Sequence, residues 1–330
     1  MNRNNSHLNG FGRPLVALVL LAGAGSLAAQ EPEATALVER MAQATEQLAY
    51  DGTFVYQRGT DIDAMRIVHR FDNGVERERL ISLSGPEREV IRDGRRVTCL
   101  FADDREAMVE KSEPRDFLSL GLDAPIESLV RNYTFSIAGT DRVAGRATTV
   151  VKIVPKEPNR YGYRLWVDEE HGLLLKSLIL NRAGQALEQV QFVDVKIGEA
   201  VTAASLETQI VGSGFTWRTT AEPENSAAEV VETSGWTVNW LPEGFEMRNY
   251  KVQKMSESDM PVSHMVYSDG LAMVSVFVEK LMSTTEPMQG YSSMGAVNAF
   301  SRVAKDHQIT VVGEIPLPTV RQIASSVAHQ

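Results

Sequence analysis

The sequence predicts an α+β protein whose larger part is a curved antiparallel sheet with helices, followed by a smaller α+β domain. One helical stripe of apolar residues near the N-terminus gives way to a long series of short strands separated by turn residues. A stretch rich in Gly, Ser, Thr and Glu at 211–233 interrupts this series, and a shorter one follows. We therefore expect a larger domain at 29–210, a linker at 211–233 and a smaller domain at 234–330.

The first 28 residues have the features of a cleaved secretory signal peptide. Arg3 and Arg13 precede a short apolar core at 15–21, and Ser26-Leu27-Ala28 offers small residues where a signal peptidase cleaves. This segment is short for a membrane span of about 20 residues, so an uncleaved anchor is the weaker alternative. No cysteine stands directly after the cleavage site, which argues against a lipoprotein. A soluble, exported product is expected.

The helical stripe comes next and leads into the first strand. Between residues 33 and 50 apolar side chains recur at three- and four-residue spacing, which predicts an amphipathic helix that packs on the following sheet. The pattern breaks at Asp51-Gly52, which we interpret as a turn. Thr53-Phe54-Val55-Tyr56 then has the β-branched and aromatic character of a strand.

Turn residues divide the rest of the larger domain into strands. Asn73-Gly74 and Asp93-Gly94 favour hairpin turns, because these residue types tolerate positive φ. Residues 102–130 are less regular and are expected to form an excursion, with a short helix at 125–131. Roughly nine or ten sequential strands with one long helix suggest a curved sheet or unclosed β-barrel over helices. Further strands are expected at 65–71, 78–83, 89–91, 97–101, 133–138, 148–155, 161–168, 173–181 and 186–197.

Several of these strands are apolar on both faces. One face can pack on the helices, which leaves the other either covered or available to an apolar ligand. Structural packing on both faces is the more common outcome, and for any single residue a place in the core is at least as good an interpretation. The candidates for an apolar cleft are Phe54, Tyr56, Ile67, Phe71, Tyr163, Leu165 and Trp166.

The smaller domain shows the same alternation over a shorter length. Strands are expected at 236–240, 246–254, 264–268, 272–279 and 307–312, with a closing helix at 319–326, whereas 295–300 is ambiguous. Aromatic side chains offer large contact areas for a protein partner. The candidates for partner contact are Trp236, Trp240, Phe245, Tyr267 and Phe277.

The sequence does not favour catalysis, a metal site or a bound cofactor. The single cysteine, Cys99, excludes an internal disulfide, and the six histidines lack the spacing of a metal motif. Cys99 and His69 lack a third residue to complete a triad, and no glycine-rich phosphate loop occurs. The formal charge of −10 argues against nucleic acid or an anionic membrane as the main partner. Function is therefore expected to depend on binding surfaces.

An ordered set of stretches resembles the MucB/RseB family of sigma-factor regulators and covers nearly all of the chain after the signal peptide. Each stretch is weak alone, but their order is specific. Residues 102–130 and 211–233 carry no such signal. The stretches are Gly52–Tyr56, His69-Arg70, Glu78–Leu80, Arg142–Arg146, Arg160–Asp168, Gly172–Ser177, Trp240–Phe245, Tyr267–Ala272, Ser275–Glu279 and Thr310–Pro316.

The resemblance implies a periplasmic protein that binds the periplasmic domain of a membrane-bound anti-sigma factor of the RseA/MucA type. Binding would shield that factor from site-1 proteolysis and so restrain the envelope-stress sigma factor, of the sigma-E/AlgU type. It also implies a LolA/LolB-like larger domain that senses lipid, such as the acyl chain of a lipoprotein or lipopolysaccharide. The alternative is a periplasmic lipid or lipoprotein carrier of the LolA/LolB type, although simple carriers lack a domain after residue 233. Homo-oligomerisation stays open.

Overall fold

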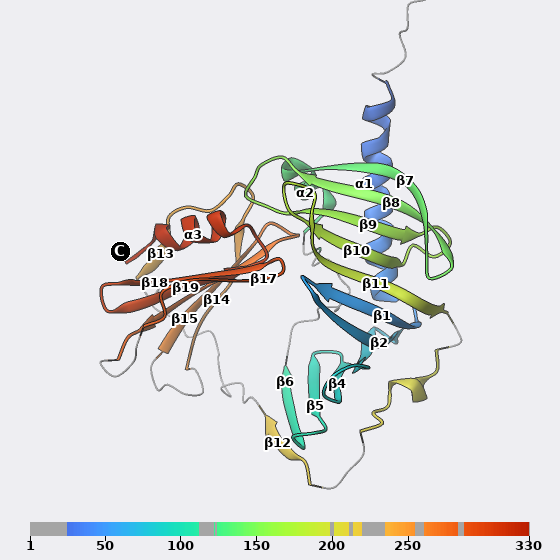
Figure 1. Ribbon diagram of the computed structural model, residues 1–330, viewed down its shortest axis with the longest axis horizontal. Helices are drawn as coiled ribbons and strands as arrows, with labels where there is room; N and C mark the ends of the chain where they lie inside the picture. The colour runs from blue at the N-terminus through green and yellow to red at the C-terminus, as the bar shows by residue number, and fades with distance from the viewer. Residues whose placement is uncertain are drawn as a thin grey trace, which may run out of the picture.

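The computed structural model describes residues 25–111, 122, 124–198, 201–210, 214–219, 235–254, 261–282 and 287–329. These residues form two main sheets that lie side by side, each with a long face against a helix (Figure 1). Residues 1–24, which hold most of the expected signal peptide, lie outside the described residues. No described helix combines the length and the apolar character needed to cross a membrane.

The larger sheet has 12 strands, and its two end strands, β12 and β7, do not pair with each other, so the sheet is an unclosed barrel as expected. The strand order is β12-β6-β5-β4-β3-β2-β1-β11-β10-β9-β8-β7, antiparallel except for the β12–β6 pair. The strands are β1 (Tyr50–Arg58), β2 (Asp61–Asp72), β3 (Val75–Ser82), β4 (Arg88–Asp93), β5 (Arg96–Phe101), β6 (Glu106–Lys111), β7 (Tyr133–Val143), β8 (Arg146–Pro155), β9 (Gly162–Asp168), β10 (Leu174–Leu180), β11 (Ala186–Ile197) and β12 (Thr216–Thr219).

Two of these strands lie where the sequence predicted none. β6 lies in the expected excursion, and β12 lies in the expected linker. Both lie at one end of the sheet, where β12 is exposed along its length and pairs with β6, whose buried residues are Ala107 and Val109. Neither segment has an apolar pattern long enough to predict a strand. The short helix expected at 125–131 is present as α2 (Ile126–Asn132).

Asp51-Gly52 is not a turn, as the sequence had suggested, but part of β1. The chain leaves helix α1 (Gly25–Gln47) and enters the strand at Tyr50. Gly52 instead admits a close neighbour, because a Cβ atom there would lie 2.6 Å from the ring of Phe192 on β11. The adjacent register shift at Thr53/Phe54 bends the strand.

Two apolar clusters fill the larger domain. The first, which we call the α1 cluster, joins Ala34, Val38 and Met41 of α1 to α2 and to the inner side chains of β7–β10. The second, the β1 cluster, centres on Tyr50, Phe54 and Phe192. Figure 1 shows α1 running across the strands β7–β11, and the helix contacts β7, β10 and β2. The amphipathic helix expected from the sequence therefore packs on the sheet.

The smaller domain is a six-stranded antiparallel sheet covered on one face by α3 (Leu317–Ser326). Its order is β14-β15-β16-β19-β18-β17, and a separate pair joins β13 (Trp236–Val238) to β20 (Val327–His329). The core consists of Val274, Val276, Ile309 and Val311 from the sheet with Val320 and others from α3. The six strands are β14 (Glu246–Lys254), β15 (Pro261–Ser268), β16 (Met273–Lys280), β17 (Gly290–Met294), β18 (Val297–Ala304) and β19 (His307–Gly313).

Candidate functional site

The seven side chains proposed for an apolar cleft are divided between the two clusters of the larger domain. Phe54, Ile67 and Trp166 are buried in the β1 cluster, and Tyr56 packs against it. Tyr163 and Leu165 belong to the α1 cluster. Phe71 belongs to neither and is 43% exposed at the end of β2. These residues therefore do not line one continuous surface, and their role in ligand binding stays a prediction.

The five aromatic residues proposed for partner contact are mostly inside the smaller domain. Trp236, Phe245 and Tyr267 are buried in its core, and Trp240 packs against that core. Phe277 differs, because its side chain is partly buried on β16 and its ring stacks on His264 at 4.2 Å. Alternation along β16 places Phe277 on the sheet face opposite Val276 and the α3 core. Phe277 and Trp240 are thus the candidates that retain exposed area.

A buried polar group joins the two domains. Asp269, in the turn between β15 and β16, accepts hydrogen bonds from Arg160 Nε at 2.5 Å and from the Tyr133 hydroxyl at 2.9 Å. The Arg160 guanidinium also donates to the main-chain oxygen of Glu243 and lies 5.3 Å from the centre of the Phe245 ring. Burial, with Asp269 nearby, raises the pKa of Tyr133 well above its ordinary value. We call this group the Asp269 junction.

The same turn places an apolar side chain inside the larger domain. Leu271 is 5% exposed and belongs to the α1 cluster, with Leu129 and Tyr133. Gly270 beside it has φ +97°, and a Cβ atom there would lie 2.5 Å from Ala124 Cβ. The turn therefore fits against α2 without room for another carbon atom.

A second group of contacts joins the domains at the tip of the β17–β18 hairpin. Glu188 on β11 accepts one hydrogen bond from the main-chain nitrogen of Ala296 at 2.8 Å and another from the Tyr56 hydroxyl at 2.7 Å. Nearby, Asn298 donates to the Tyr161 hydroxyl at 2.9 Å. Burial and the bond to Glu188 raise the pKa of Tyr56 above its ordinary value. A cleft candidate, Tyr56, is thereby connected to the smaller domain through one carboxylate.

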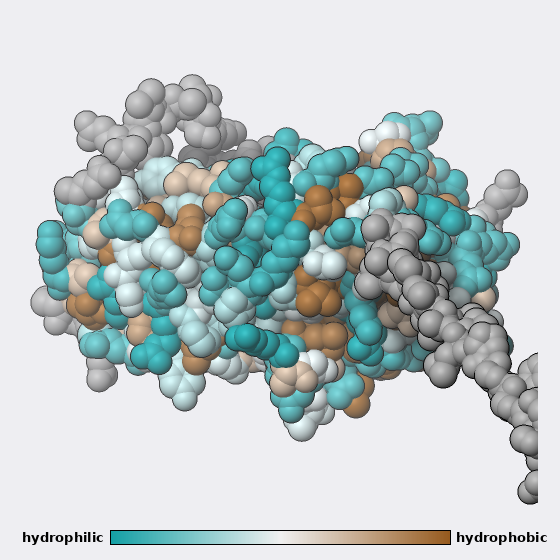
Figure 2. Space-filling model, turned by 90° about the horizontal axis from the view of Figure 1, so that it is seen from above, coloured by the Kyte–Doolittle hydropathy of each residue, from teal (hydrophilic) through white to brown (hydrophobic). Residues whose placement is uncertain are grey.

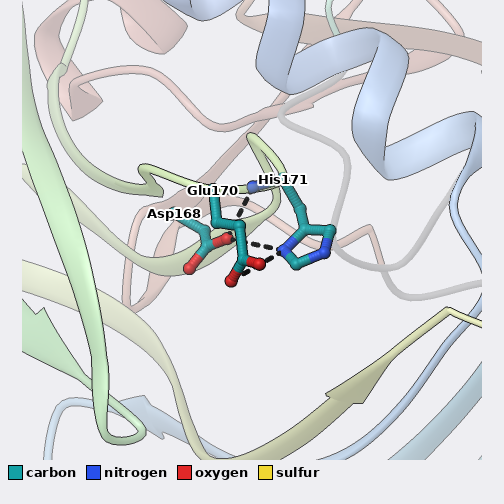
Figure 3. A group of neighbouring side chains, drawn as sticks. All are labelled: Asp168, Glu170 and His171. Carbon is teal, nitrogen blue, oxygen red and sulfur yellow. Dashed lines mark hydrogen bonds and ion pairs between the residues drawn. The ribbon is translucent and has the colours of Figure 1, made fainter.

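A cluster of potential metal ligands lies in the turn after β9. Ligand atoms of Asp168, Glu170 and His171 all lie within 4.8 Å of one another (Figure 3). However, Arg146 Nη2 lies 3.1 Å from Asp168 Oδ2, 2.7 Å from Glu170 Oε2 and 2.8 Å from His171 Nδ1. Burial raises the pKa of Asp168, but the bonds from Arg146 and the His171 backbone outweigh it, and the net shift is downward. A guanidinium thus already binds this cluster, which is an ion-pair network.

Exposed apolar side chains of the described residues are distributed over both domains. Figure 2 shows brown side chains gathered to the right of the midline, on the larger domain, with hydrophilic residues around them. Side chains with much exposed apolar area are scattered over different strands in both domains. They include Ile62, Val154, Val193, Trp217, Met247, Met288 and Tyr291.

Comparison with family models matches both domains in the expected order. The model of the MucB/RseB N-terminal domain matches residues 33–210, and that of the MucB/RseB C-terminal domain matches residues 230–328. The chain belongs to the MucB/RseB family. Its members include the sigma factor AlgU regulatory protein MucB of Pseudomonas aeruginosa, which is 33% identical over 316 residues, 91% of this chain and 92% of that protein. The sigma-E factor regulatory protein RseB of Escherichia coli is 27% identical over 320 residues, 96% of each chain.

Solved MucB structures share this fold. A crystal structure of MucB in complex with MucA(peri) superimposes with a TM-score of 0.71 at 31% identity, covering 90% of this chain and 99% of that one. A crystal structure of MucB alone gives a TM-score of 0.63 at 30% identity, covering 91% and 98%. The chain is therefore a homologue of regulatory proteins along nearly its whole length.

The residues of the two domain contacts were not identified as functional from the sequence. Arg160 and Asp269 each lie in a stretch that carries the MucB/RseB resemblance, but Asp269-Gly270 by itself indicates only a hairpin turn. Nothing in the sequence shows that two such stretches 109 residues apart meet. The sequence offers no signal for this burial, because Arg160 precedes β9 in a polar segment, where an arginine is usually exposed.

Proposed function

We propose that this protein is a periplasmic regulator that binds the periplasmic domain of an anti-sigma factor, shields it from site-1 proteolysis and so restrains the envelope-stress sigma factor. The observation that carries the proposal is the likeness over both domains to MucB, a protein crystallised with the periplasmic part of MucA. The likeness at 31% identity covers 90% of this chain, so it includes both domains.

Sensing of a lipid or lipoprotein by the larger domain is the second part of the proposal. An unclosed barrel with a helix across one face has a thick apolar layer between helix and sheet, here the α1 cluster. Acyl chains have the same chemistry as the side chains of this layer, so a chain could replace them without exposing apolar surface to water. The ligand would then act by changing the surface offered to the anti-sigma factor.

A protease-protection assay tests both parts. The mature protein is mixed with the periplasmic domain of its cognate anti-sigma factor and with the site-1 protease, with and without a lipid mimic. Slower cleavage in the presence of the protein, reversed by the lipid mimic, is the expected result. Binding with no protection would contradict the regulatory role, and protection that lipid leaves unchanged would contradict the sensing role. Acyl-chain uptake without any anti-sigma binding would instead identify a carrier.

A pair of variants tests whether the smaller domain contributes to partner binding. Phe277 lies on the sheet face opposite α3, whereas Tyr291 is 71% exposed on the edge strand β17. Phe277→Ala is expected to weaken binding of the anti-sigma domain, and Tyr291→Ala serves as the control for loss of an aromatic ring elsewhere on the same sheet. Equal affinities of the two variants and the unaltered protein would exclude Phe277 from the contact.

A further inference from the structure

We propose that the turn formed by Asp269, Gly270 and Leu271 is a releasable latch, and that its docking and the binding of an anionic acyl-chain ligand by the larger domain exclude each other. Leu271 fills apolar space that an acyl chain would otherwise fill. Asp269 pairs with the Arg160 guanidinium, which would otherwise bind the acidic head group of the ligand. The inference rests on the proposed function in that it specifies how lipid binding alters the protein.

Leu271 belongs to the smaller domain, but its side chain packs in the core of the larger domain. Among the described residues, every other buried member of the α1 cluster comes from α1, α2 or β7–β10. The side chain contacts the same apolar layer as Val38 and Leu165, which are fully buried. Removing the turn would therefore open the edge of this layer beside α2, and the exposed wall would be apolar.

The turn is preformed for insertion. Oδ1 of Asp269 accepts hydrogen bonds from the main-chain nitrogens of Leu271 at 3.0 Å and Ala272 at 2.8 Å. This oxygen fixes the shape of the turn from within the smaller domain. Oδ2 points outward to Arg160 and Tyr133 of the larger domain. One carboxylate thus shapes the turn with one oxygen and docks it with the other.

The receiving surface has the chemistry of a site for an anionic amphiphile. Arg160 offers a guanidinium whose side chain is fully buried. Its Nη1 has no hydrogen-bond partner within the part of the chain that the structure describes, although the carboxylate of Glu157 lies 3.9 Å away. The apolar wall formed by Leu129 and its neighbours in the α1 cluster begins directly beside it. An acidic head bound at Arg160 with an acyl chain against this wall would reproduce the contacts of Asp269 and Leu271. Water alone would not, because it leaves the apolar wall hydrated and Nε of the arginine without a charged acceptor.

Mutual exclusion makes two measurable predictions, because coupling between two binding events is reciprocal. The first uses dansyl-undecanoic acid, a fluorescent fatty acid, as the ligand. Leu271→Ala weakens the latch and is expected to bind the probe roughly tenfold more tightly than the unaltered protein. Val278→Ala removes a buried side chain from the smaller domain's own core and is expected to bind the probe as the unaltered protein does. Affinities equal within twofold for Leu271→Ala and the unaltered protein would overturn the proposal, as would the absence of saturable binding to both.

The second measurement needs no variant, so it stands even if Leu271→Ala folds poorly. Hydrogen exchange of the unaltered protein is compared with and without saturating probe. Faster exchange is expected in the 269–272 turn, with no change in β19, which lies inside the smaller sheet. Unchanged exchange in the turn at saturation would refute the latch. Binding of the anti-sigma domain is measured separately without probe, so failure of the latch and failure of the proposed function give different results.

Discussion

Arg160 and Asp269 form an ion pair in which both side chains are fully buried, with Arg160 Nε 2.5 Å from Asp269 Oδ2. They belong to different domains and to different stretches that carry the family resemblance. A buried charge that loses its partner retains the full cost of its dehydration, so the pair favours one relative placement of the two domains over separated ones in water.

Replacing Asp269 by Asn should destabilise the protein by about 3 kcal/mol, because the buried Arg160 guanidinium then keeps only the half-exposed carboxylate of Glu157, 3.9 Å from Nη1, as a counter-ion. Chemical denaturation followed by tryptophan fluorescence measures this, and the transition of the smaller domain should move to lower denaturant. Asp306→Asn is the control, since Asp306 pairs with Lys280 and His307 but is 58% exposed. A midpoint for Asp269→Asn no lower than that of Asp306→Asn would show that the buried pair contributes nothing to stability.

Alanine variants of Gly270 and Gly290 distinguish the cost of a steric clash from the cost of backbone strain. Both have positive φ, +97° and +115°, so alanine should cost about 1–2 kcal/mol at either position through strain alone. At Gly270 the new Cβ would also lie 2.5 Å from Ala124 Cβ and 3.0 Å from Leu129, whereas at Gly290 it meets nothing within 4 Å. Gly270→Ala should therefore lower the melting temperature clearly more than Gly290→Ala. Equal shifts would mean that the turn does not press against α2 in solution.

Tyr56→Phe tests the second domain contact. The variant keeps the ring and removes the hydroxyl that donates to Glu188, so it should lose about 1 kcal/mol of stability. The Glu188 carboxylate also loses the group that orients it toward the Ala296 nitrogen. Faster hydrogen exchange at Ala296 is the specific signature. Tyr291→Phe, on an exposed ring, should change neither quantity.

Low pH should lower the unfolding free energy of the protein through protonation of Asp168. Its pKa is lowered on balance by Arg146, so its contribution is present above the ordinary aspartate pKa of about 4 and is lost as pH falls through the lower folded-state value. Arg146→Ala should cost about 1–3 kcal/mol at pH 7. The variant should also lose less stability between pH 7 and pH 3 than the unaltered protein, because burial then raises the pKa of Asp168. Arg77→Ala, which breaks the exposed pair with Asp93, should leave the pH dependence unaltered.

His264 should make the unfolding free energy depend on pH in a higher pH range than Asp168 does. Burial and the nearby Lys251 lower the pKa of His264, so the folded state holds a neutral imidazole at a pH where an unfolded histidine takes up a proton. Its contribution is therefore present above the ordinary histidine pKa of about 6.5 and is lost as pH falls below it. His264→Gln should flatten the decline in unfolding free energy between pH 7 and pH 5. If the unfolding free energy of the variant declines as steeply as that of the unaltered protein, groups other than His264 cause the decline.

The sequence determined most of the local structure because the signals are local. Alternation of apolar and polar residues gave the strands, asparagine-glycine and aspartate-glycine pairs gave turns, and three- and four-residue spacing gave α1. The family followed from an ordered set of short stretches, each recognisable without a structure. The signals failed for the short segments β6 and β12, and β12 is exposed along its length and pairs with β6, a strand distant in sequence.

Only the tertiary structure decided which residues meet across domains. Asp51-Gly52 and Asp269-Gly270 are the same dipeptide, yet the first lies within β1 under a phenylalanine ring and the second is inserted into another domain. An apolar residue such as Leu271 has the same sequence signature whether it packs in its own core or in a neighbouring one. Burial depends on the surface that a residue contacts, and that surface is assembled from segments whose separation along the chain carries no local signal.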